Sequence, residues 1–172
     1  MLSGKWALAL GVAVAVVAAD QLTKALVVEK MILHQSIEIG EGWFSLTYVR
    51  NTGAAFGLLA GKRAAWRIPF FLGFSTGAVL LLVWFLRGVA PQRKALIAAC
   101  GAVLGGAVGN MIDRLILGEV IDFLDVYVGS YHWPAFNVAD AAITVGVAVL
   151  CADALRAPAP ETIEPPPETT QR

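Results

Sequence analysis

Charged residues are scarce in this chain, and their scarcity excludes an ordinary water-soluble globule. Asp, Glu, Lys and Arg make up 15% of the 172 residues, against about 25% in typical soluble domains. Hydrophobic residues reach 58% and the mean hydropathy is +0.69, whereas soluble domains are about 45–50% apolar. The composition therefore indicates a membrane protein.

An excess of basic charge is also missing, and so are clusters of metal-binding residues. Thirteen basic and thirteen acidic residues cancel, which excludes a nucleic-acid partner because phosphate binding needs surplus positive charge. Cys100 and Cys151 both lie in apolar runs, where we expect small buried hydrophobes and not a disulfide or a metal site. His34 and His132 are far apart and lack neighbouring ligands, so no metal is expected.

Long apolar runs are what the chain does have. Each of four segments is long enough to cross a membrane, which takes about 20 residues; they cover residues 6–28, 68–86, 95–115 and 137–155. The first continues past Asp20 and Lys24 and is not followed by a polar mature domain, so we expect a retained anchor and not a cleaved signal peptide. The expected fold is an all-α membrane protein, a four-transmembrane-helix bundle within residues 1–156.

The connecting segments carry further signals. In residues 29–67, two stretches with alternating or β-branched residues flank the turn-prone 40–42, which predicts a β-hairpin. Residues 157–172 are polar and proline-rich, which predicts a disordered tail.

Basic residues near the helix ends predict the orientation in the membrane. One side holds Lys5, Arg87, Arg93, Lys94 and Arg156, and the segment 116–136 has no Lys or Arg. The segment 29–67 holds basic residues too, so the bias is confined to the short loops. It predicts that both termini and the 87–94 loop are cytoplasmic, while 29–67 and 116–136 face outward.

Polar side chains from three helices and one loop are expected at the same outer level of the membrane. Using about 1.5 Å of rise per residue, Lys24 lies roughly 6 Å and Asp20 roughly 12 Å below the outer end of their helix. The other members lie near the outer ends of the third and fourth helices or in the loop between them: Asn110, Asp113, Arg114, Asp122, Asp125, Asn137 and Asp140. Ionisable groups at membrane depth are costly and indicate a functional site.

Each member also has a purely structural interpretation. Asp20 and Lys24 are four residues apart and can form a charge-neutralising pair. Asn137 and Asp140 can cap a helix, and Asn110 with its neighbours Asp113 and Arg114 can form an internal polar clasp. Gly101, Gly105 and Gly109 recur every fourth residue, which predicts close helix packing and not a phosphate loop. These interpretations explain each polar residue separately, but they do not explain why all of these residues lie at the same depth in the membrane.

Five blocks of sequence resemble bacterial lipoprotein signal peptidase, also called signal peptidase II. They occur in that family's order and cover every predicted helix except the second: residues 20–24 (DQLTK), 51–57 (NTGAAFG), 105–114 (GGAVGNMIDR), 118–123 (GEVIDF) and 134–145 (PAFNVADAAITV). The resemblance implies an intramembrane aspartic endopeptidase that cleaves prolipoproteins just before a diacylglyceryl-modified cysteine. It also implies a small extracytoplasmic β-cradle and a short interfacial helix within residues 29–67.

Site residues follow from the same resemblance. The implied catalytic pair is Asp122 and Asp140. The implied substrate-binding or supporting residues are Asn51, Asn110, Asp113, Arg114, Asn137, Asp20 and Lys24. Two carboxylates that share one proton can hydrolyse a peptide bond as acid and base, and no metal or organic cofactor is required.

The expected partners are the prolipoprotein and membrane lipid, and the expected state is a monomer in the bacterial inner membrane with its active site towards the extracytoplasmic face. The alternative function is a small ion- or proton-coupled transporter, which would also bury Asp20, Lys24, Asp113 and Asp140. Transport needs a polar path through both membrane halves or related repeats, and the sequence shows neither.

Overall fold

Four long helices and a small antiparallel sheet make up the computed structural model, which describes residues 4–53 and 66–156. The elements in chain order are α1 (Gly4–Lys30), β1 (Ser36–Gly40), β2 (Phe44–Asn51), α2 (Arg67–Gly88), α3 (Lys94–Ile116), β3 (Val120–Val128), β4 (Tyr131–His132) and α4 (Val138–Arg156). All four helices are long and apolar enough to cross a membrane. The predicted bundle is therefore confirmed, with helix ends within two residues of expectation.

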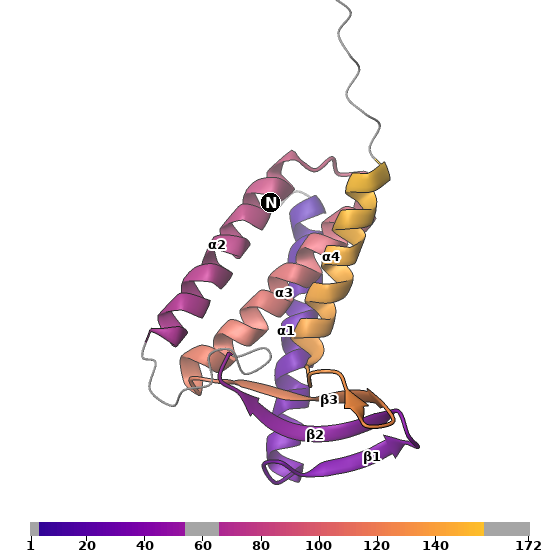
Figure 1. The fold of residues 1–172 in the computed structure, drawn as a ribbon. Coiled ribbons are helices and arrows are strands. Elements are labelled where there is room, and N and C mark those ends of the chain that lie inside the picture. Colours follow the sequence, from indigo (N-terminus) through magenta and orange to yellow (C-terminus); the bar gives the residue numbers. More distant parts are fainter. Residues whose placement is uncertain (1–3, 54–65, 157–172) are drawn as a thin grey trace, which may run out of the picture.

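Helix α3 is the centre of the bundle. Half of the residues in its apolar stretch are buried, against 6% for α2, and α3 packs on α1, α2 and α4. In Figure 1 the sheet lies at one end of the bundle, whereas the start of α1, the α2–α3 connection and the end of α4 lie at the other.

Glycines on α3 allow its neighbours to approach closely. A Cβ atom at Gly101 or Gly105 would lie 2.5 or 2.6 Å from a backbone oxygen of α1, and one at Gly106 would lie 2.4 Å from the Ala139 oxygen of α4. These distances are too short for any side chain, so the predicted role of the glycine repeat in helix packing is confirmed. Backbone contact of this kind replaces the hydrophobic effect, which is absent between helices in lipid.

Large apolar side chains cover the outside of the helices. Phe74, Leu80 and Trp84 of α2 are more than 60% exposed, as expected for a surface in contact with lipid. The expectation that both cysteines are buried is wrong in part, since Cys100 is buried but Cys151 is exposed, and both are free. Lipid is as apolar as the protein interior, so an apolar run does not tell which of its residues face the bundle.

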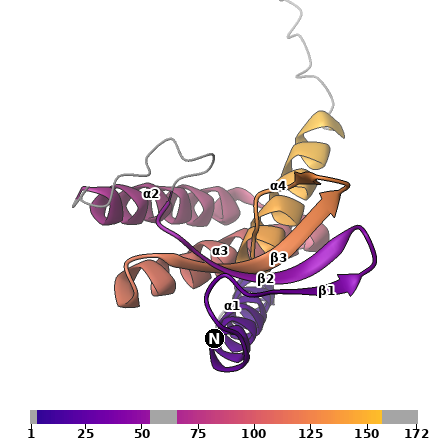
Figure 2. The same cartoon turned by 60° about the horizontal axis from the view of Figure 1, so that its bottom comes forward.

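The sheet has the strand order β1-β2-β3-β4, all antiparallel. The predicted hairpin is confirmed as β1 and β2. Strand β3 was not expected; it comes from the segment 116–136 and pairs along β2, with Asn51 opposite Val120 and Val49 opposite Asp122. Figure 2 shows the sheet crossing the end of the bundle beside α3 and α4, with α2 to one side.

Residues 54–65 and 157–172 lie outside the described residues. The interfacial helix implied for the first connection and the disordered tail therefore stay predictions.

Candidate active site

Asp122 lies near the start of β3, opposite Val49 of β2. It belongs to β3 and its side chain is 2% exposed. The Asn51 amide donates to its Oδ2 atom at 3.0 Å and the Asn137 amide donates to its Oδ1 atom at 2.8 Å. Both carboxyl oxygens of Asp122 are thus held by side-chain amides from a neighbouring strand and from the start of α4.

Asp140 lies in the first turn of α4 and forms a reciprocal cap with Asn137, the residue just before the helix. The Asp140 N–H donates to Asn137 Oδ1 at 2.9 Å, and the Asn137 N–H donates to Asp140 Oδ2 at 3.3 Å. The capping interpretation of this pair is correct. The Asn110 amide additionally donates to Asp140 Oδ1 at 2.7 Å, so the capping carboxylate also belongs to the polar group.

A short backbone pairing brings the two aspartates together. After β4 the chain returns along β3, where the Leu124 and Phe136 N–H groups each donate to the other residue's carbonyl, at 2.8 and 3.0 Å. Asn137 follows directly and starts α4. The register of this pairing places the first turn of α4 against Asp122, which a linear reading of the sequence does not reveal.

A buried lysine supports this pair from α1. The Lys24 ammonium contacts carboxyl oxygens of Asp20 and Asp113, each at 2.8 Å, and donates to Asn110 Oδ1 at 3.1 Å. All three of its protons therefore have acceptors. Because Asn110 Oδ1 is occupied in this way, the amide nitrogen of Asn110 points towards Asp140.

Asp20 and Asp113 also bind the backbone of the elements that carry the aspartate pair. Asp20 Oδ1 accepts the N–H of Ala139 in α4 at 3.0 Å, and Asp113 Oδ2 accepts the N–H of Ile121 in β3 at 3.1 Å. A carboxylate at a helix N-terminus is favourable because it accepts N–H groups that lack partners within the helix. These two residues position α4 and β3 and are not part of the pair itself.

Gln21 is a member of this group that sequence reasoning missed. Its amide nitrogen lies within hydrogen-bond distance of Asp113 Oδ1 at 2.9 Å, Asp20 Oδ2 at 3.1 Å and the Gly109 carbonyl at 3.2 Å. Its position within the block 20–24 was the available signal. A neutral side chain in an apolar helix, however, indicates a functional site less strongly than the charged side chains beside it.

Burial and charge act together on Asp122. Loss of water around the carboxyl, and secondly the nearby Asp140 carboxylate, raise the pKa of Asp122 from 3.8 to about 7. The hydrogen bonds from Asn51 and Asn137 oppose this rise but are smaller effects. A carboxyl with such a pKa can hold a proton near neutral pH, which is unusual and typical of an acid–base site.

Arg114 and Asn51 lie at the edge of the site towards α2. The Arg114 guanidinium lies 5.0 Å from the centre of the Phe71 ring, and it donates back to the Asn110 carbonyl. Asn51 Oδ1 accepts the Gly53 N–H at 2.9 Å, which turns the Asn51 amide nitrogen towards Asp122. Gly53 has φ +100°, and a Cβ there would lie 2.2 Å from the Phe71 ring, so only glycine fits this turn.

Asp125 belongs to a different cluster. Its carboxylate contacts the His132 ring at 2.9 Å and accepts from the Thr47 hydroxyl at 3.2 Å. The His132 ring stacks on Tyr127. Among residues 4–53 and 66–156, no hydrogen bond joins this cluster to Asp122 or Asp140, and no group of three His, Cys, Asp or Glu side chains is arranged to hold a metal.

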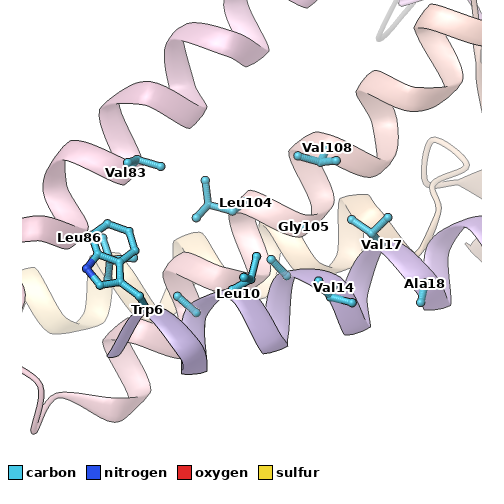
Figure 3. A pocket seen from close by; sticks show the side chains of 12 residues that line it. Trp6, Leu10, Val14, Val17, Ala18, Val83, Leu86, Leu104, Gly105 and Val108 are labelled. Atoms are coloured by element: carbon cyan, nitrogen blue, oxygen red, sulfur yellow. The ribbon is translucent and has the colours of Figure 1, made fainter. Parts of the chain in front are cut away.

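Two hollows differ in how they relate to the site. A hollow of about 430 Å³ beside Asp140 is lined by Trp133, Phe136 and small residues of α4. Another, of about 560 Å³, lies between α1, α2 and α3, where residues such as Leu10, Val14 and Leu104 face it (Figure 3). Among the residues that the structure describes, no ionisable side chain lines the second hollow, so these residues supply no acid–base chemistry there.

Comparison with known proteins identifies the family of this chain. Residues 12–156 match the sequence profile of a family described as Signal peptidase (SPase) II. A lipoprotein signal peptidase of Syntrophotalea carbinolica is 52% identical over 139 residues, which cover 81% of this chain and 85% of that protein. One of Geobacter sulfurreducens is 50% identical over 137 residues, covering 80% and 84%.

A solved structure has a similar fold. A bacterial membrane enzyme solved at 2.3 Å resolution superimposes with a TM-score of 0.78 at 32% identity, covering 91% of this chain and 93% of the other. With the match to the family profile extending through all four helices, the chain belongs to the signal peptidase II family.

Proposed function

We propose that this protein is an aspartic endopeptidase that removes signal peptides from diacylglyceryl-modified prolipoproteins, with Asp122 and Asp140 as its catalytic pair. The observation that carries the proposal is the shared amide network. Asn137 contacts both carboxyl groups, while Asn51 and Asn110 each hold one of them. Membership of a peptidase family leaves the transporter alternative without support.

The two carboxyl groups differ in a way that assigns their roles at rest. Asp140 lies in the first turn of α4 and accepts hydrogen bonds from the Asn110 amide and the Asn137 N–H. Asp122 is more deeply buried and has a pKa of about 7, so it holds the shared proton. Asp140 is then the general base and Asp122 the general acid.

The reaction follows from these roles. Asp140 removes a proton from water as the water oxygen bonds to the scissile carbonyl carbon, and Asp122 gives its proton to the carbonyl oxygen. As the tetrahedral diol collapses, the C–N bond breaks, and the proton on Asp140 passes to the leaving nitrogen. The diol hydroxyl returns a proton to Asp122, so the pair regains its starting state. No step needs a metal or an organic cofactor.

The remaining site residues transfer no proton in this reaction; they orient the pair and hold the elements that carry it. Asn51, Asn110 and Asn137 orient the two carboxyl groups. Lys24 pairs with both Asp20 and Asp113, which fix α4 and β3. Arg114 lies near both catalytic carboxylates at the edge towards α2 and suits contact with the substrate backbone.

Position in the membrane supports the substrate class. The aspartate pair lies at the sheet end of spanning helices, where a membrane-embedded signal peptide ends and its lipidated cysteine begins. The apolar hollow beside Asp140 suits a small apolar residue next to the cleaved bond. We place both termini in the cytoplasm, the sheet and the site at the extracytoplasmic face, and the protein as a monomer.

Cleavage of a diacylated prolipoprotein in proteoliposomes tests the proposal. Asp122→Asn and Asp140→Asn keep the shape but remove an ionisable group, and each should lower kcat by about 10²–10⁴-fold, the range of general acid–base catalysis. The double variant should be scarcely worse, because the two groups act as a unit. Substrate binding, followed separately on the inactive variants, should persist.

Asp125→Asn is the matched control, since it removes an equally acidic residue of the same strand that contacts His132 and not the pair. It should retain substantial activity. Near-parent cleavage by a folded, inserted Asp122→Asn or Asp140→Asn variant would refute the assignment. Equal cleavage of the unlipidated precursor would refute the substrate class but not the catalytic pair.

A further inference from the structure

The end of the bundle opposite the sheet carries a hollow that the proposed peptidase mechanism does not use. Its volume is about 600 Å³, and it is lined by Trp84, Phe85, Arg87, Gly88, Val89 and Arg93. These residues come from the end of α2 and the short connection to α3 (Figure 1). One part of the lining is aromatic and aliphatic, and the other carries two guanidinium groups. A ligand that fits both parts has an apolar portion and an anionic one.

The charge around the hollow is positive. The Arg87 guanidinium makes no ion pair with any residue in 4–53 or 66–156. Arg93 pairs through one nitrogen with Asp153 near the end of α4. Two arginines therefore face one carboxylate, which leaves Arg87 and the remaining donors of Arg93 available to an anion.

Lys5 removes the feature that would repel such an anion. The carbonyl oxygens at the C-terminal end of a helix carry partial negative charge. The Lys5 ammonium donates to the carbonyls of Leu86, Arg87 and Val89 at 3.1, 2.8 and 3.0 Å. Its positive charge therefore offsets the partial negative charge at this end of α2. The adjacent start of α3 has no side-chain cap, and its N-terminal dipole adds positive potential.

The depth of the hollow matches the boundary between lipid tails and headgroups. Helix α2 is long and apolar enough to span the membrane, so Arg87 in its last turn lies near the headgroups. Trp84 is three residues earlier, roughly 5 Å deeper along the helix, and is 67% exposed. The guanidinium groups thus lie at the depth of the lipid phosphates, and the aromatic rings lie beside the part of the acyl chain nearest to the headgroup.

We propose that this hollow binds an anionic phospholipid, with its phosphate between Arg87 and Arg93 and its acyl chain along Trp84 and Phe85. Basic pockets between spanning helices are known to recognise such headgroups. A zwitterionic lipid places an ammonium group near the same guanidinium groups and binds less well. The site is independent of the peptidase proposal, because none of its residues contacts the aspartate pair.

Native mass spectrometry of the purified full-length protein tests this, using phosphatidylglycerol and phosphatidylcholine with identical acyl chains as probes. The parent should retain phosphatidylglycerol in preference. Arg87→Gln should lower that retention about fivefold, since one basic side chain near an anionic lipid contributes about 1 kcal/mol. Trp84→Ala, which leaves the charges intact, should lower retention of the same lipid through its lost apolar contact.

The matched control is Arg156→Gln, the same charge change at the same end of the bundle but outside the hollow. It should retain the parent's lipid preference. Equal retention of the two lipids by the parent would overturn the proposal. Equal loss in the Arg87 and Arg156 variants would also overturn it, since net charge and not the hollow would then govern binding.

Discussion

Asn137 shows how one residue can combine a structural and a functional role. It is fully buried; its side-chain oxygen caps α4 and its amide nitrogen donates to Asp122. The capping interpretation of Asn137 and the catalytic interpretation of its surroundings therefore do not compete. The oxygen of this amide starts the helix, and the nitrogen of the same amide holds Asp122, the acid of the proposed pair.

A serine at this position separates the two roles. Ser caps a helix about as well as Asn but lacks the side-chain amide nitrogen that reaches Asp122. We expect Asn137→Ser to lower kcat by at least tenfold with substrate binding kept, whereas Asn137→Ala should additionally lose about 1 kcal/mol of stability with the cap. Thermal unfolding in detergent and cleavage kinetics measure the two effects. Parent-like kcat in the serine variant would contradict a role for this amide.

The raised pKa of Asp122 predicts a specific pH dependence. Because the pKa is about 7 in the folded protein and near 3.8 when unfolded, its contribution to stability is fully present below about pH 4 and is lost as pH rises through about 7. Asp122→Asn cannot ionise, so the variant does not lose this contribution. Its melting temperature should therefore rise relative to that of the parent as the pH is raised from 5 to 8. Cleavage by the parent should fall above about pH 7 as the acid loses its proton.

A constant difference between parent and Asp122→Asn from pH 5 to pH 8 would show that Asp122 does not titrate in this range.

At the scale of elements, α3 organises the site by its two faces of small residues. Gly101 and Gly105 admit α1, which carries Asp20 and Lys24, and Gly106 admits α4, which carries Asp140. Asn110 and Asp113 of α3 then reach partners on both neighbours. The polar network between α1, α3 and α4 thus requires that their backbones pack closely.

Gly105→Ala tests this dependence. The added methyl group would lie 2.6 Å from the Ala13 carbonyl oxygen, so α1 must move away, at a cost of about 1–3 kcal/mol for overpacking. Activity should fall with stability because Lys24 moves with α1. Gly77→Ala in α2 is the matched control, since a Cβ there meets no atom within 4 Å. Equal melting temperatures for the two variants would contradict the packing argument.

For the whole molecule, the arrangement places all chemistry of the proposed pair at one end. The sheet and the aspartate pair lie there, while the α2–α3 connection and the ends of α1 and α4 lie at the other (Figure 1). Four crossings put both described ends of the chain on the same side, and the basic 87–94 loop predicts that this side is cytoplasmic.

Cysteine labelling of intact cells checks this orientation. In a variant lacking Cys100 and Cys151, a single cysteine in place of Pro91 should be protected from an impermeant reagent until the membrane is opened. A cysteine in place of Glu41, in the β1–β2 turn, should react from outside. Labelling of residue 91 in intact cells would reverse the proposed topology.

The four spanning helices can be predicted from the amino-acid sequence alone, because a hydrocarbon layer demands about 20 apolar residues in each. The sequence also predicts the β1–β2 hairpin, through local alternation and a glycine-rich turn, and the close-packed glycines of α3. These features depend on interactions between residues near in the chain, or on the solvent alone.

The pairing of the polar residues, in contrast, depends on contacts between distant parts of the chain. Strand β3 depends on β2, a partner from a distant part of the chain, and the return of Phe136 along β3 sets Asn137 between the two aspartates. Gln21 and the outward-facing Cys151 were missed for a related reason. In a membrane, the lipid and the protein interior are equally apolar, so a helix needs no polar face towards its solvent, and its sequence does not record which side meets the protein.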